Sequence, residues 1–218
     1  MSRTPKHRVV AALIDRHGRT YANEAGITLR NTPSPLFRLL VLSLLLSARI
    51  DANIAVAAAR ALAEAGWTTP EKLADSRWEE RARVLNRSGY ARYDERTSTM
   101  LADMSDLVLR RYDGDLRKLR DAAGHDPAEE RRALQDFSGI GAVGAAIFAR
   151  EVQLVWDEMY PFADDRALGC AERLGLGAEV KDLQRNTSDQ EHFTLLVAAL
   201  VRCDLAGDHA AILEAAKS

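Results

Sequence analysis

Apolar residues recur along most of this chain at intervals of three and four residues, within segments that suit helices. Gly, Pro or clusters of Asn and Ser separate these segments, and the alternation of apolar and polar residues that marks a strand is nearly absent. We therefore predict an all-α protein. Its helices are predicted at about residues 6–17, 35–48, 51–65, 70–75, 76–87, 92–111, 115–122, 127–136, 142–154, 165–174, 188–204 and 207–217.

The most apolar stretch is LLVLSLLLSA, residues 39–48, which lies between Arg38 and Arg49. A helix of this length is too short for a bilayer core about 30 Å thick, so the stretch predicts a buried helix and not a membrane span. Ser34 and Pro35 before it are typical of a helix N-cap and first turn. Since no signal peptide precedes it, we expect a cytoplasmic protein.

The net charge of −2 conceals a basic N-terminal region. Residues 1–38 contain two acidic residues and seven basic ones. The basic residues are Arg3, Lys6, Arg8, Arg16, Arg19, Arg30 and Arg38. This charge suits a polyanion such as nucleic acid, but a solvated basic terminus explains it equally well.

The two cysteines, Cys170 and Cys203, lie in apolar or small-residue surroundings without a C-x-x-C pattern. This predicts buried free thiols of a protein in a reducing compartment. The histidines are scattered and lack the spacing of metal ligands: His7, His17, His125, His192 and His209. We therefore expect neither a metal site nor a cofactor.

The segment LQDFSGIGAVGAAIFAR, residues 134–150, interrupts a helical pattern with three glycines. Each glycine inside a helix costs about 1 kcal/mol relative to alanine, so the glycines need another role. Gly139 and Gly141 can form a tight turn, with Ile140 pointing inward between them. Backbone N–H groups would then be exposed at the start of a helix, where a phosphate can bind. The alternative is an ordinary helix–helix corner in which the glycines allow close packing.

The pattern L-x-x-F-x-G-I-G-x-x-x-A, from Leu134 to Ala145, resembles the helix-hairpin-helix motif of the endonuclease III superfamily of DNA glycosylases. Three further segments are similar to that superfamily and follow in the same order: LLVLSLLLSAR (39–49), RSGYARYDERT (87–97) and PFADDRALGCAERLGL (161–176). The resemblance covers residues 34–176. It implies that the hairpin binds the backbone of double-stranded DNA through Ser138, Gly139, Ile140, Gly141, Ala142 and Gly144.

The resemblance also implies a catalytic aspartate at the start of a helix, some twenty residues after the hairpin. Release of a base develops positive charge on the sugar, and a nearby carboxylate stabilises that charge or helps to activate water. Asp164 and Asp165 both match, and either is equally suited to be a helix N-cap. We prefer Asp164, because the register of Asp165 would place Glu172 on the inward face of the helix. If Asp164 is the match, the residues on the inward face are Ala167, Cys170, Ala171 and Leu174.

An enzyme that acts on a base must flip it out of the duplex and usually fills the gap. By position, Arg49 matches the polar residue that enters the DNA helix in endonuclease III, and Tyr90 or Ala91 matches its apolar wedge. Val143 and Trp156 are the candidates for lining the base pocket. The alternatives are a surface role for Arg49 and core packing for Tyr90 and Trp156.

Two features of endonuclease III are missing. Relatives that also cut the strand use a lysine two residues after the second glycine of the hairpin, where this chain has Val143, and no lysine lies between Lys118 and Lys181. The iron–sulfur cluster of endonuclease III needs four cysteines in a C-terminal loop, but residues 177–218 contain only Cys203. We therefore expect no lyase step and no cluster.

We predict two helical subdomains with a DNA cleft between them. Residues 36–153 would form a bundle that contains the hairpin segment 134–150, and residues 1–35 plus 154–218 would form a discontinuous subdomain that carries the aspartate. The implied function is a monofunctional DNA glycosylase of base-excision repair. It would act as a monomer on duplex DNA with a damaged or mismatched base, away from membranes, and would associate with the nucleoid in a prokaryote.

Two other functions stay open. A non-catalytic protein could use the hairpin to recognise bent or damaged duplex, although such a protein has no use for a carboxylate near the phosphates. A helical interaction module would not bind DNA at all. Within the glycosylase hypothesis, the sequence does not rank alkylated, deaminated, oxidised and mismatched bases.

Overall fold

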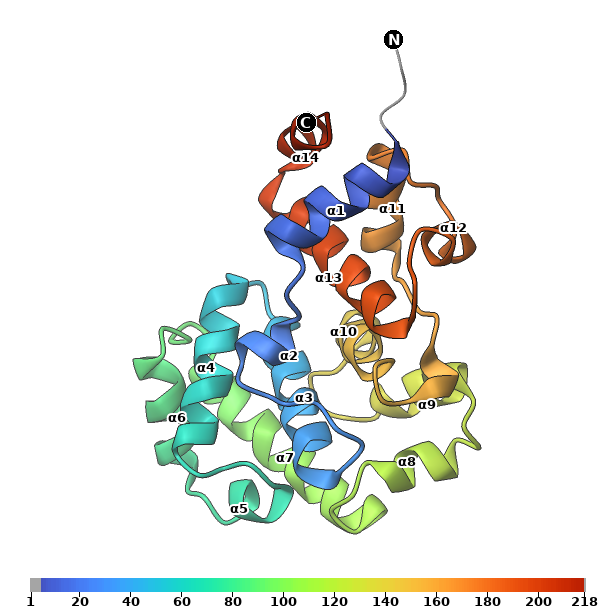
Figure 1. The fold of residues 1–218 in the computed structure, drawn as a ribbon. Helices are drawn as coiled ribbons and strands as arrows, with labels where there is room; N and C mark the ends of the chain where they lie inside the picture. The colour runs from blue at the N-terminus through green and yellow to red at the C-terminus, as the bar shows by residue number, and fades with distance from the viewer. Residues whose placement is uncertain (1–4, 218) are drawn as a thin grey trace. The chain divides into compact units, whose positions relative to one another are not determined.

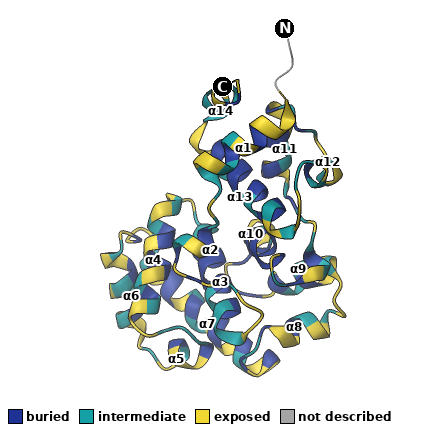
Figure 2. Cartoon of the chain, viewed as in Figure 1, coloured by how far each residue is buried: buried dark blue, intermediate teal, exposed yellow. Residues whose placement is uncertain are grey.

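The computed structural model describes residues 5–217, and every regular element in this range is helical (Figure 1). The prediction of an all-α protein is therefore confirmed. The chain folds into two compact units. One is continuous, Ala22–Glu158, and the other combines the chain up to Tyr21 with the chain from Met159 onward. In both units the helices have a buried side and an exposed side (Figure 2).

The continuous unit contains the glycine turn. Its helices are α2 (Tyr21–Glu24), α3 (Pro33–Leu46), α4 (Ala52–Glu64), α5 (Pro70–Ala74), α6 (Trp78–Arg87), α7 (Asp94–Tyr112), α8 (Arg117–Ala122), α9 (Pro127–Leu134) and α10 (Ala142–Val152). The apolar α3 packs against α4 and α10, while α7 packs against α5 and α6.

The most apolar stretch of the sequence forms α3, whose residues from Leu39 to Leu45 are all buried. No helix within residues 5–217 is long and apolar enough to cross a membrane. The predicted start of α3 at Ser34 and Pro35 is wrong by two residues. Thr32 is the N-cap and the helix begins at Pro33, because the Ser34 hydroxyl instead donates a hydrogen bond to the Thr68 carbonyl at 2.9 Å.

The discontinuous unit joins the two ends of the chain. Its helices are α1 (Lys6–His17), α11 (Asp165–Arg173), α12 (Val180–Gln184), α13 (Gln190–Ala206) and α14 (His209–Ala215), and the 3-10 helix η1 (Asp157–Met159) lies at the boundary. α1 lies along α13, blue beside red in Figure 1, and α11 packs against the same helix. The core of the unit includes Leu13 from α1, Ala167 from α11, and Phe193 and Leu200 from α13.

The boundaries of the units differ from the predicted division at 36–153. Residues 22–35 lie with the continuous unit because two hydrogen bonds attach them to its last helix and the loop that follows. The Ala22 N–H donates to the Glu151 carboxylate at 2.7 Å, and the indole of Trp156 donates to the Asn31 side chain at 3.2 Å.

Several basic residues of the N-terminal region make contacts inside their own unit. Lys6 donates to the Leu176 carbonyl at 2.8 Å, Arg16 pairs with Asp208 at 2.9 Å, and Arg38 donates to the Gly26 carbonyl at 3.0 Å. Arg3 lies outside the described residues. Packing therefore accounts for part of the basic charge, and the charge excess is not by itself a sign of a polyanion site.

A pair of carboxyl groups, one fully buried and one half-buried, joins α9 to η1. Glu130 on α9 is fully buried, and no donor within the described chain reaches its oxygens. Burial is the main cause, and interaction with Glu158 the second, that raises the pKa of Glu130 to about 8. Burial alone would also raise the pKa of Glu158, but hydrogen bonds from Arg120 and Glu130 lower it to about 2. Glu130 is therefore favoured in its protonated form, while the ionised Glu158 pairs with Arg120.

We predict that Glu130→Gln removes a pH dependence of stability. Because Glu130 has a higher pKa in the folded protein than in the unfolded chain, its stabilising effect is complete below pH 4.5 and is lost as the pH rises through about 8. The free energy of unfolding should be measured with urea between pH 5.5 and 8 for the wild type and for Glu130→Gln. With rising pH it should fall more steeply for the wild type, by up to about 1.4 kcal/mol per pH unit.

The matched control is Glu129→Gln, which changes an exposed neighbour that pairs with Arg132 on the surface. This variant should keep the wild-type slope. Equal slopes for all three proteins would show that Glu130 is ionised in the folded state and would contradict the assignment.

Candidate functional site

The turn between α9 and α10 has a buried centre and an exposed rim. Phe137 and Ile140 are buried, as expected for Ile140, and the Ile140 N–H donates to the Phe137 carbonyl at 2.9 Å. Ser138, Gly139 and Gly141 are exposed. Gly139 has φ of 83°, in the left-handed region that disfavours other residues. The two buried side chains thus fix a turn whose backbone faces solvent.

The three glycines of this segment have different roles. A Cβ atom on Gly139 would overlap the Leu44 side chain and lie 2.6 Å from Met100 Sδ, and one on Gly144 would lie 2.6 Å from Ser47 Oγ. Gly139 and Gly144 therefore permit close packing, as the helix-corner alternative proposed. No atom lies within 4 Å of a Cβ placed on Gly141, so packing does not explain this glycine.

Gly141 is the N-cap of α10, and it has no side chain to cover the start of the helix. The first hydrogen bond of α10 runs from the Ala145 N–H to the Gly141 carbonyl at 3.0 Å. The N–H groups of the first turn precede any acceptor within the helix, and the helix dipole places partial positive charge there. Ala142 is exposed and Val143 is 68% exposed, so this turn is open to solvent.

The loop between α6 and α7 is held close to the end of α3. The Tyr90 hydroxyl donates to the Leu45 carbonyl at 3.0 Å, and the side chain is 1% exposed. The assignment of Tyr90 as an intercalating residue is therefore wrong for this structure, because the tyrosine serves the core. Ala91, the other candidate for the wedge, is exposed in the same loop. Arg49 is exposed in the turn that follows α3.

Trp156 is also a core residue. It is 0% exposed, its ring packs edge-on against Phe148 at a centroid distance of 5.5 Å, and its indole N–H is bonded to Asn31. The assignment of Trp156 to a base pocket is thus contradicted by its burial. Val143 remains exposed at the start of α10, where it is free to contact a ligand.

Asp164 is the N-cap of α11 in the discontinuous unit. Its Oδ1 accepts a hydrogen bond from the Ala167 N–H at 3.1 Å, and the residue is half-buried, whereas Asp165 is exposed in the first turn. The predicted register is confirmed, since Glu172 is exposed. The residues predicted on the inward face are all buried: Ala167, Cys170, Ala171 and Leu174.

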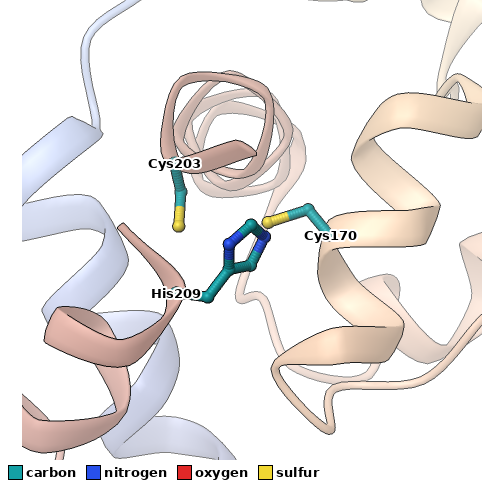
Figure 3. Close-up of side chains that lie close together, drawn as sticks. All are labelled: Cys170, Cys203 and His209. Carbon is teal, nitrogen blue, oxygen red and sulfur yellow. The ribbon is translucent and has the colours of Figure 1, made fainter. Parts of the chain in front are cut away.

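The structure also brings together three side chains that the sequence did not connect. Cys170 of α11, Cys203 of α13 and His209 of α14 lie side by side (Figure 3). Burial, together with the adjacent Cys203, raises the pKa of the Cys170 thiol to about 12. Because a neutral thiol is a poor nucleophile, Cys170 is not suited to covalent catalysis.

Comparison with known proteins shows one kind of similarity. No family model and no curated sequence matches the chain. Among solved structures, an endonuclease III trapped as a covalent intermediate with DNA matches with a TM-score of 0.53 and 16% identity, over 93% of this chain and 86% of that one. A non-covalent complex of endonuclease III with DNA matches with a TM-score of 0.55 and 16% identity, over 89% and 80%.

The chain has the endonuclease III fold. Within that fold, two helix starts bear the residues that the sequence predicted for binding and catalysis, and the two starts differ. The start of α10 has no side-chain cap, while the start of α11 is capped by the carboxylate of Asp164.

The different roles of the glycines predict different responses to alanine. Gly139→Ala should lower the free energy of unfolding by about 2–4 kcal/mol. The alanine would have to adopt left-handed backbone angles, and its methyl group would clash with Leu44 and Met100. Gly141→Ala should change it by less than about 1 kcal/mol, because its backbone angles are open to alanine and the space is empty. Urea unfolding of both variants measures this difference, and equal losses would contradict the assigned roles.

Proposed function

We propose that this protein is a monofunctional DNA glycosylase, which flips a damaged or mismatched base out of duplex DNA and hydrolyses its N-glycosidic bond. The similarity of its fold to DNA-bound structures of endonuclease III supports an interaction with DNA. The proposal assigns DNA binding to the glycine turn and the stabilisation of positive charge to Asp164.

The observation that carries the proposal is the open start of α10. Gly141, Ala142 and Val143 at this start are exposed residues, and Gly139 and Ser138 leave the approach clear of large side chains. A phosphate can accept hydrogen bonds from these groups and gains from the helix dipole. Such contacts bind the DNA backbone independently of base sequence, as an enzyme that searches for rare lesions requires.

Asp164 has the properties of a stabilising carboxylate. Its Oδ1 accepts a hydrogen bond from the Ala167 N–H, which holds the carboxyl group in place at the start of α11. When the bond between base and sugar breaks, positive charge develops on the deoxyribose, and a fixed negative charge next to it lowers the barrier. Asp164 would also orient the attacking water. Asp165, exposed in the next position, provides an internal comparison.

Val143 supports hydrolysis by water. Formation of a Schiff base with the sugar requires an amine, and position 143 carries an exposed apolar side chain on the first turn of α10. The segment between Lys118 and Lys181 contains no lysine to replace it. The product would therefore be an intact strand with an abasic site, and Val143 would form an apolar contact for the flipped nucleotide.

We predict that base release depends on Asp164. Single-turnover release should be measured on duplexes that carry uracil, hypoxanthine, 3-methyladenine, oxidised pyrimidines, or adenine opposite 8-oxoguanine. For the base that is released, Asp164→Asn should lower the rate by about 100-fold or more, because the stabilising charge is lost. Asp165→Asn should stay within about threefold of the wild type, and strands should break only after alkali treatment.

Two results would overturn this assignment. Strand breaks without alkali, with a protein–DNA adduct trapped by borohydride, would show a lyase mechanism. Release of no base from any duplex, with tight salt-dependent binding retained, would favour a non-catalytic protein that recognises bent or damaged DNA.

A further inference from the structure

Three side chains with metal-binding atoms converge in the discontinuous unit. Cys170 comes from α11, Cys203 from α13, and His209 from the first turn of α14, and the imidazole lies between the two sulfur atoms (Figure 3). One ligand atom of each residue lies within 4.8 Å of the other two. Both cysteines are fully buried and neither is in a disulfide.

The polar environment of this cluster is incomplete without a ligand. His209 Nε2 is buried and has no hydrogen-bond partner, which is costly for an imidazole nitrogen. The carboxylate of Asp204 lies close by, with Oδ1 at 3.7 Å from this nitrogen, too far for a direct hydrogen bond. Arg166 and Arg173 pair with Asp204 and hold it in place.

We propose that Cys170, Cys203 and His209 bind a zinc ion, with the carboxylate of Asp204 beside it. Zinc prefers thiolate and imidazole ligands in a tetrahedron, with Zn–S of about 2.3 Å and Zn–N of about 2.0–2.1 Å, which places neighbouring ligand atoms about 3.4–3.8 Å apart. The ligand atoms of Cys170, Cys203 and His209 lie within 4.8 Å of one another, so side-chain movements of about 1 Å would bring them to these distances. Asp204 is placed to be the fourth ligand or to hold the ligating imidazole.

The donor set distinguishes zinc from other occupants. Calcium and magnesium take oxygen ligands, and an iron–sulfur cluster of the endonuclease III kind takes four thiolates, whereas the described chain offers two thiols and one imidazole here. A disulfide between Cys170 and Cys203 would need an oxidant and would leave the His209 nitrogen without a partner. Mixed sulfur and nitrogen donors in a buried site match zinc.

A zinc ion at this position would join three helices of the unit. Cys170 lies less than two turns after the N-cap of α11, so the ion would fix the helix that Asp164 begins. The ion would also anchor α14, a helix of seven residues, to α11 and α13. This role is structural and does not depend on the proposed glycosylase activity, and neither does the following test, which contains no DNA.

Metal titration of the full chain tests the site. The protein should be reduced, stripped of metal with a chelator, and titrated with Co²⁺ and then Zn²⁺. We expect one equivalent of Co²⁺ to produce near-ultraviolet thiolate-to-cobalt absorption and the intense visible bands of tetrahedral cobalt, and Zn²⁺ to abolish both. Cys170→Ala, Cys203→Ala and His209→Ala should each weaken binding by about 100-fold or more, and Asp204→Asn by about tenfold. His192→Ala, which changes a half-buried histidine about three turns from Cys203 along α13, should bind like the wild type.

The wild-type spectrum decides the question even where a variant does not fold. Absence of thiolate-to-cobalt absorption in the reduced wild type would overturn the proposal. So would full cobalt binding by helical, folded Cys170→Ala or His209→Ala protein, because the ion would then lie elsewhere.

Discussion

The close contact between the glycine turn and the end of α3 is the constraint on which the candidate site depends. Gly139 lies against Leu44 with no room for a methyl group, and Gly144 lies against Ser47 in the same way. Ile140, between these two glycines, is buried, while Ala142 and Val143 in the first turn of α10 are exposed. The end of α3 also accepts the hydrogen bond from Tyr90, so the same few residues position the hairpin and the loop between α6 and α7.

The two proposed functional centres use the same physical property of helices in opposite ways. A helix start presents N–H groups that lack acceptors, together with partial positive charge. At α10 the N-cap is Gly141, so the groups are left available for an external anion. At α11 the N-cap is Asp164, so the protein supplies the anion itself and holds it at a defined position. An open helix start suits binding, and a capped one suits a fixed charge.

The long helices were predictable because each repeats its apolar pattern over several turns, and the register of α11 followed from the same periodicity. The short helices α2, α12 and η1 have no such repeat and were not predicted. Tyr90 and Trp156 were assigned to DNA by position, but each is held in the core by a hydrogen-bond acceptor that only the folded chain supplies. The cluster of Cys170, Cys203 and His209 likewise forms only when three helices pack together, so no local spacing could indicate it.

Gly141 offers the most direct test of whether the hairpin binds phosphate. Asp and Asn are equally good N-caps and the space around this position is empty, so Gly141→Asp and Gly141→Asn should both fold and should differ only in charge. Affinity for a duplex with an abasic-site analogue should be measured against salt concentration. If the start of α10 binds the DNA backbone, the Asp variant should bind about tenfold or more weakly than the Asn variant at low salt, and the difference should shrink as salt rises. Equal affinities at every salt concentration would contradict a phosphate contact at this turn.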